Sequence, residues 1–148
     1  MWRRGALIAV LAGALATPLI AAASTSDGPV FKGTVEADEN AKFRFEVLKN
    51  KKGKRRVDYP KSKRLDAQCE TGPQDIDVTF GSPEKSAKIS EDGDFDFDNS
   101  GEKYVVYVRG RISGKSASGV LRYQGPTDFR QGQQDCDSGE VEWTAEKT

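Results

Sequence analysis

The sequence predicts an all-β protein, and the architecture it favours is an antiparallel β-sandwich of about ten short strands. Apolar and polar residues alternate with a period of two along most of the chain, whereas helical periodicity is almost absent. Turn-forming residues interrupt this alternation at intervals of roughly 8–12 residues. A closed meander barrel of the lipocalin type has the same alternation, so it stays as the alternative architecture.

The expected strands follow one another with one buried and one wet face each. In chain order they are residues 30–36, 42–47, 57–59, 65–69, 75–80, 85–89, 94–98, 104–112, 117–123 and 140–144. Glycine, proline and asparagine clusters separate them, and residues 125–134 are expected to be a polar loop. Trp143 lies on the apolar side of the last strand, so we expect it in the core rather than on a sugar-binding surface.

The first 23 residues have the composition of a cleavable signal peptide. Arg3 and Arg4 give it a positive start, an uncharged apolar run follows, and residues 21–23 are three alanines. We expect cleavage near Ala23, which would release one domain, residues 24–148, outside the cytoplasm. An uncleaved membrane anchor is the alternative, but the run is rich in Ala and Gly rather than in Leu and Ile. No later apolar run is long enough to cross a membrane.

Two cysteines, Cys69 and Cys136, lie in the expected mature chain, and we expect them to form a disulfide bond because exported proteins usually pair their cysteines. Closing a loop of this length would stabilise the fold by roughly 4 kcal/mol. Two free buried thiols are the alternative. Cleavage would leave 21 basic and 23 acidic residues, and this near-neutral balance argues against nucleic acid as a bulk partner.

The C-terminal part of the chain carries a pattern that spans residues 119–145. It ends Cys-Asp-Ser-Gly-Glu-Val-Glu-Trp-Thr-Ala, and Asp-Gly-Asp-Phe stands upstream at residues 92–95. This pattern resembles that of a group of small secreted bacterial β-proteins of unknown function, which end in a C-x-S/T-G-x-V-x-W-x-A strand. The resemblance implies a secreted β-domain with a structural cysteine pair, and it implies no functional residues.

The composition favours a protein that is not an enzyme. The chain has no histidine, so a serine or cysteine nucleophile paired with histidine is excluded. No pattern indicates a cofactor. A pair of carboxylates, as in glycoside hydrolysis, needs no histidine, so a small carboxylate-dependent hydrolase stays an alternative. A barrel that carries an apolar ligand is a third possibility.

Acidic residues are concentrated in one expected strand. There Asp94, Asp96 and Asp98 would form a row on one face, and hard oxygen ligands of this kind suit Ca²⁺. The segment that starts at Asp96 matches the opening half of an EF-hand loop but lacks the glutamate at the twelfth position. We expect the row to be a solvated face opposite two buried phenylalanines, with a Ca²⁺ site as the weaker alternative.

Basic residues are concentrated between Lys49 and Arg64, relieved only by Asp58. This run spans an expected hairpin tip at residues 50–53, and it would suit docking to an anionic cell-envelope polymer, an acidic polysaccharide or a membrane surface. The candidate contacts are Lys51, Lys52, Lys54, Arg55, Arg56, Lys61, Lys63 and Arg64. The alternatives are the ordinary charging of a hairpin tip and edge strand, and pairing with the acidic strand inside the fold. The sequence therefore predicts an exported, non-catalytic domain that acts by surface binding.

Overall fold

The computed structural model describes residues 28–36, 38–81 and 85–148, which form ten strands and no helix. This confirms the all-β prediction. The strands are β1 (Val30–Val35), β2 (Asp38–Lys49), β3 (Arg55–Cys69), β4 (Gly72–Thr79), β5 (Ala87–Lys88), β6 (Asp94–Asp98), β7 (Val105–Ser113), β8 (Ser116–Phe129), β9 (Gly132–Asp137) and β10 (Val141–Lys147). The expected signal peptide, residues 1–23, lies outside the described residues. In the described part of the chain, no helix has the length and apolarity of a membrane span.

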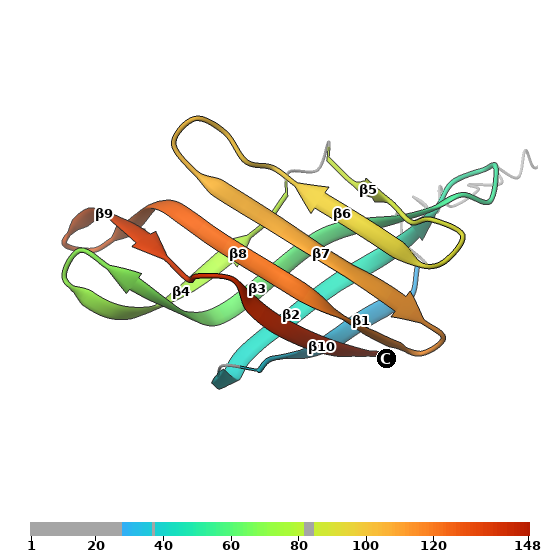
Figure 1. Ribbon diagram of the computed structural model, residues 1–148, viewed down its shortest axis with the longest axis horizontal. Helices are drawn as coiled ribbons and strands as arrows, with labels where there is room; N and C mark the ends of the chain where they lie inside the picture. The colour runs from blue at the N-terminus through green and yellow to red at the C-terminus, as the bar shows by residue number, and fades with distance from the viewer. Residues whose placement is uncertain (1–27, 37, 82–84) are drawn as a thin grey trace, which may run out of the picture.

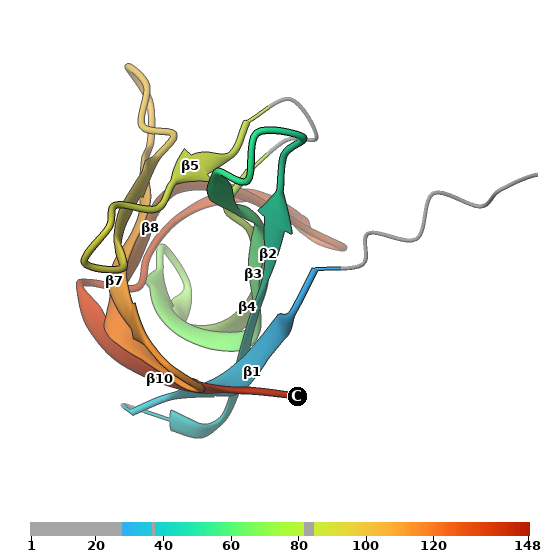
Figure 2. The same ribbon diagram turned by 90° about the vertical axis from the view of Figure 1, so that its right-hand side faces the viewer.

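The ten strands are antiparallel and form one continuous sheet in the order β10-β1-β2-β3-β9-β8-β7-β6, with β4 and β5 paired to β3. The sheet folds over, so that β1–β5 and β6–β10 face each other as the two layers of a sandwich-like fold (Figures 1 and 2). Hydrogen bonds also join the layers, because β3 pairs with β9 and β10 pairs with both β1 and β8. The strand order therefore differs from that of a simple meander, in which each strand pairs with the next.

Strand β3 joins two segments that the alternation separates, because it contains two β-bulges. Tyr59 and Arg64 have left-handed backbone angles, with φ of 47° and 56°, and the pairing of β3 with its neighbours shifts register at both places. A bulge adds one residue and reverses which side chains face inward. Unbroken alternation from the buried Val57 would point Lys61 and Lys63 into the core, whereas the bulge at Tyr59 turns both outward.

The stretch expected to be a polar loop, residues 125–134, instead forms the end of β8 and the start of β9. Its backbone pairs in a regular hairpin, from Gly125 opposite Cys136 to Phe129 opposite Gly132. Cys136 is the one fully buried residue of β9, so this hairpin lacks the apolar alternation that marks a strand with a buried face.

An aromatic cluster fills the core between the two layers. Trp143 is fully buried, as expected, and its ring lies 4.6 Å from Phe43 and 5.7 Å from Phe45. Gly110 of β7, two strands away from Trp143 in the same layer, leaves room for the indole because it has no side chain, and a Cβ there would lie 2.5 Å from the Trp143 ring. The core therefore depends on a glycine that faces a tryptophan.

The disulfide bond between Cys69 and Cys136 is present, with an S–S distance of 1.97 Å, and this confirms the predicted pairing. It joins β3 to β9 where the two strands share only two paired positions, Gln68 with Asp137 and Cys69 with Cys136. The bond therefore reinforces a short junction between the two layers.

Candidate functional site

The acidic row of β6 is paired with arginines of the neighbouring strand β7. Arg111 Nε lies 2.6 Å from Asp94 Oδ1, and this hydrogen bond lowers the pKa of Asp94. Arg109 lies 3.2 Å from Asp96 and 3.5 Å from Asp98. The partners of the row are thus on β7 rather than in the basic run. Among the described residues, no three acidic or cysteine side chains gather as a metal site would require.

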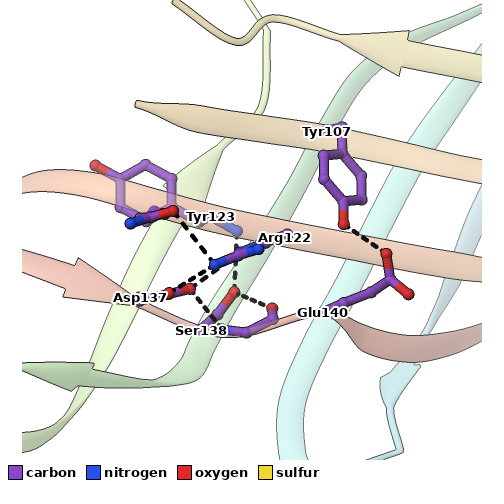
Figure 3. A network of polar contacts seen from close by, with 8 residues as sticks. Tyr107, Arg122, Tyr123, Asp137, Ser138 and Glu140 are labelled. Atoms are coloured by element: carbon purple, nitrogen blue, oxygen red, sulfur yellow. Dashed lines mark hydrogen bonds and ion pairs between the residues drawn. The ribbon is translucent and has the colours of Figure 1, made fainter. Parts of the chain in front are cut away.

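A second polar network lies where β8 changes partner from β10 to β9 (Figure 3). On the side of β8 that faces β9 and β10, Tyr123 has no strand partner, although it pairs with Val106 of β7 on the other side. Ser138 takes the place of the missing partner, since its hydroxyl accepts a 2.9 Å hydrogen bond from the Tyr123 amide. Arg122 Nη2 lies 2.8 Å from Asp137 Oδ2, and the Tyr107 hydroxyl donates to Glu140 over 2.5 Å. These side chains partner one another, which indicates a structural junction.

Basic side chains gather on the outer face of β1, β2 and β3. Five of them surround a hollow of about 320 Å³, which we name the sheet hollow. Its lining residues are Lys32, Gly33, Lys42, Phe43, Arg44, Lys61 and Lys63. Among the described residues, no carboxylate lines it, and Arg44 is the one cation of the five with a carboxylate partner, Glu46 at 2.7 Å.

The strand register sets like charges opposite each other in the sheet hollow. Lys32 of β1 pairs with Arg44 of β2, Arg44 pairs with Lys61 of β3, and Lys42 pairs with Lys63. Side chains opposite each other on an antiparallel sheet have Cβ atoms roughly 5 Å apart, and like charges in this arrangement destabilise it. Three such pairs therefore form a compact cationic array on one face.

A second basic hollow, of about 480 Å³, lies at the β2–β3 turn, and we name it the hairpin hollow. Its lining residues are Asn50, Lys51, Lys52, Lys54, Arg56 and Lys88. Asn50 shapes the turn, since its side-chain oxygen accepts hydrogen bonds from the amides of Lys52 and Lys54 at 3.0 and 2.9 Å. Arg56 is opposite Lys88 of β5, and it donates a 2.8 Å hydrogen bond to the Ser86 carbonyl.

Two carboxylates on the same outer face separate the hollows. Glu46 of β2 is paired with Asp58 of β3, between the Arg44–Lys61 pair and Arg56. Asp58 is only 5% exposed and its Oδ1 has no hydrogen-bond partner. Burial raises the pKa of Asp58, and the charge of Glu46 raises it further. The face therefore carries two cationic groups rather than one uninterrupted patch.

The eight basic residues predicted from the sequence divide among these places. Lys61 and Lys63 lie in the sheet hollow, while Lys51, Lys52, Lys54 and Arg56 lie in the hairpin hollow. Arg55 joins Lys54 and Arg56 in the wall of a shallow groove of about 1360 Å³ that also reaches β6 and β7. Arg64 is exposed at its bulge, where its amide donates a 3.0 Å hydrogen bond to Asp77.

Sequence reasoning missed four cations of the two hollows, namely Lys32, Lys42, Arg44 and Lys88. The alternation around Phe43 already marks Lys42 and Arg44 as outward-facing. Their convergence with the basic run depends on the register of β1, β2 and β3, which no local pattern carries.

Comparison with known proteins adds no relative, since no family model, no curated protein and no solved structure matches the chain. The resemblance to small secreted β-proteins thus stays a prediction, and the cationic face is the structural feature that bears on function.

Proposed function

We propose that this chain is an exported, non-catalytic binding domain that holds an anionic cell-envelope polymer or polysaccharide on the outer face of β1–β3. The observation that carries the proposal is the set of three like-charged pairs across adjacent strands in the sheet hollow. Each pair costs the folded protein a few tenths of a kcal/mol, up to about 1 kcal/mol. A bound polyanion offsets this repulsion, because its charges replace the carboxylates that the lining lacks.

The arrangement also suits an extended ligand. The two hollows lie on one face and bring together cations from β1, β2, β3, β5 and the β2–β3 turn. Neighbouring strands are roughly 4.8 Å apart, and outward side chains along one strand are roughly 7 Å apart. A polymer with repeated negative charges can therefore meet several cations at once, while the pair of Glu46 and Asp58 interrupts the surface between them.

The fold and the disulfide bond are compatible with an extracytoplasmic location. The bond between Cys69 and Cys136 suits an oxidising compartment, where such bonds persist. We therefore include export by the expected signal peptide, with cleavage near Ala23, in the proposal.

The test is retention of the disulfide-bonded protein on an immobilised polyuronate at increasing salt concentration. Retention should fall steeply with salt, because polyanion binding releases counterions. A variant with Lys32, Lys42, Lys61 and Lys63 changed to Gln should elute at clearly lower salt. The matched control changes Lys103, Lys115, Arg130 and Lys147 to Gln, which removes the same charge from exposed positions elsewhere. Equal loss in both variants, or retention that ignores salt, contradicts the proposal.

The alternatives gain less support from the geometry. A hydrolase needs two carboxyl groups across a cleft, at roughly 5–10 Å. Glu36 and Glu142 are instead in direct contact, and their hydrogen bond raises the pKa of Glu36, but neither lines any hollow described above. An apolar ligand would need space inside the fold, where Trp143 and the phenylalanine rings pack against one another.

A further inference from the structure

We infer that the sheet hollow is a binding site for a phosphomonoester group, a doubly charged terminal or pendant phosphate of the ligand. This inference deepens the proposed function and rests on it for the choice of face. It rests separately on the size of the hollow, on its charge and on one unpartnered donor.

The first observation is the density of positive charge. Four lysines and one arginine line a hollow of about 320 Å³, and Phe43 and Gly33 complete the lining. Among the described residues, none of the four lysines has a carboxylate within ion-pair distance. A carboxylate or a sulfate monoester brings a single negative charge, whereas a phosphomonoester brings nearly two at neutral pH, with three acceptor oxygens. The phosphomonoester therefore compensates this charge best within so small a volume.

The second observation is an unmet hydrogen bond on the arginine of the site. The Nη2 atom of Arg44 is bound to Glu46, but its Nε atom is buried without a hydrogen-bond partner. A buried donor left without an acceptor costs about 1–3 kcal/mol. Arginine forms strong, directed hydrogen bonds to phosphate oxygens. The Arg44 side chain as a whole is 40% exposed, so a rotation that turns Nε toward the hollow would let a bound phosphate supply the acceptor that Nε lacks.

The third observation separates this hollow from the hairpin hollow. Arg56 in the hairpin hollow already donates to the hydroxyl and the carbonyl of Ser86, and most of the other cations there lie on or beside a turn. The cations of the sheet hollow instead project from three adjacent, hydrogen-bonded strands, which fix their spacing. Preorganised donors bind a compact anion with less loss of side-chain entropy, so the specific site belongs to the sheet hollow.

The test uses three small probes, methyl phosphate, methyl sulfate and acetate, titrated into the isotopically labelled, disulfide-bonded protein at pH 7.5 and followed by amide chemical shifts. Methyl phosphate should bind at least tenfold more tightly than methyl sulfate, which has the same shape but one charge, and than acetate. The largest shifts should fall on β1–β3 around Lys32, Arg44 and Lys61. Changing Lys61 and Lys63 to Gln should weaken methyl phosphate binding at least tenfold, whereas changing Lys51 and Lys52 should leave it nearly unchanged.

Several results would overturn the inference. These are equal binding of the three probes, shifts centred on Lys51 and Lys88, or shifts that never saturate. Failure here is distinguishable from failure of the proposed function, because retention on a polyuronate needs no phosphate. Retention without a preference for methyl phosphate refutes the phosphate site alone. Saturable methyl phosphate binding without retention refutes the polymer and keeps the site.

Discussion

The like-charged pairs of the sheet hollow predict that removing binding residues will make the protein more stable. In the variant with Lys32, Lys42, Lys61 and Lys63 changed to Gln, all three cross-strand repulsions disappear, while the Arg44–Glu46 ion pair remains. With a few tenths of a kcal/mol for each pair, the free energy of unfolding should rise by about 1 kcal/mol at low salt. For a domain of this size, that corresponds to a melting temperature higher by about 4 °C.

The assay is urea unfolding followed by Trp143 fluorescence, in about 20 mM and about 1 M salt. At about 1 M salt the screening length is only about 3 Å, so the gain should nearly vanish. The control variant at Lys103, Lys115, Arg130 and Lys147 lowers the net charge equally and should show no such gain. If the variant on β1–β3 is less stable than the wild type at low salt, or matches the control, the repulsion does not exist and the main support for a binding face is lost.

Three further predictions concern the stability of the fold. Asp58→Asn should stabilise the protein at pH 7, because burial raises the pKa of Asp58 and its ionised carboxylate therefore destabilises the folded state. Below about pH 4 the wild-type carboxyl is protonated and this destabilisation is absent. The wild type loses stability as the pH rises through the folded pKa of Asp58. The two proteins should therefore converge in acid unfolding titrations, and a constant difference would contradict this. Gly110→Ala should cost about 1–3 kcal/mol and alter Trp143 fluorescence, because the new Cβ would lie 2.5 Å from the indole; unchanged stability and fluorescence would contradict this packing. Changing Cys69 and Cys136 together to Ala should lower the unfolding free energy by up to roughly 4 kcal/mol, measured by thermal unfolding, and no loss would show that the β3–β9 junction is stable without the bond.

The acidic strand and the basic face illustrate two uses of surface charge in this fold. On β6 and β7, opposite charges face each other across the strands, as Asp94 does with Arg111, and the surface is internally neutralised. On β1–β3 the same kind of pairing sets lysine against lysine, as in Lys42 with Lys63. The first arrangement supports the fold, whereas the second destabilises it and leaves charge for a partner.

Sequence reasoning predicted most of the strands, because each strand with one buried face repeats apolar residues with a period of two. Segments 75–80 and 94–98, for example, lie close to β4 and β6. It missed β9, whose side chains are mostly exposed, and it divided β3 at the two bulges. A bulge shifts the phase of the alternation by one residue, so a strand that contains one looks like two separate strands.

Only part of the candidate site could be predicted from the sequence. The basic run pointed to Lys61 and Lys63, but their outward orientation depends on the bulge at Tyr59. Lys32 and Arg44 are 29 and 17 residues from Lys61 in the chain, and they meet it only through strand pairing. The cationic array therefore depends on the pairing register of β1, β2 and β3, which local sequence patterns do not encode.

By itself, the sequence determined the all-β class, the pairing of the two cysteines and the burial of Trp143, because these follow from periodicity and from residue chemistry. Tertiary structure decided which charges neutralise one another and which stand together. The reason is physical: the interaction of two charges depends on their distance in space, and a folded sheet sets that distance by pairing strands that are far apart in the chain.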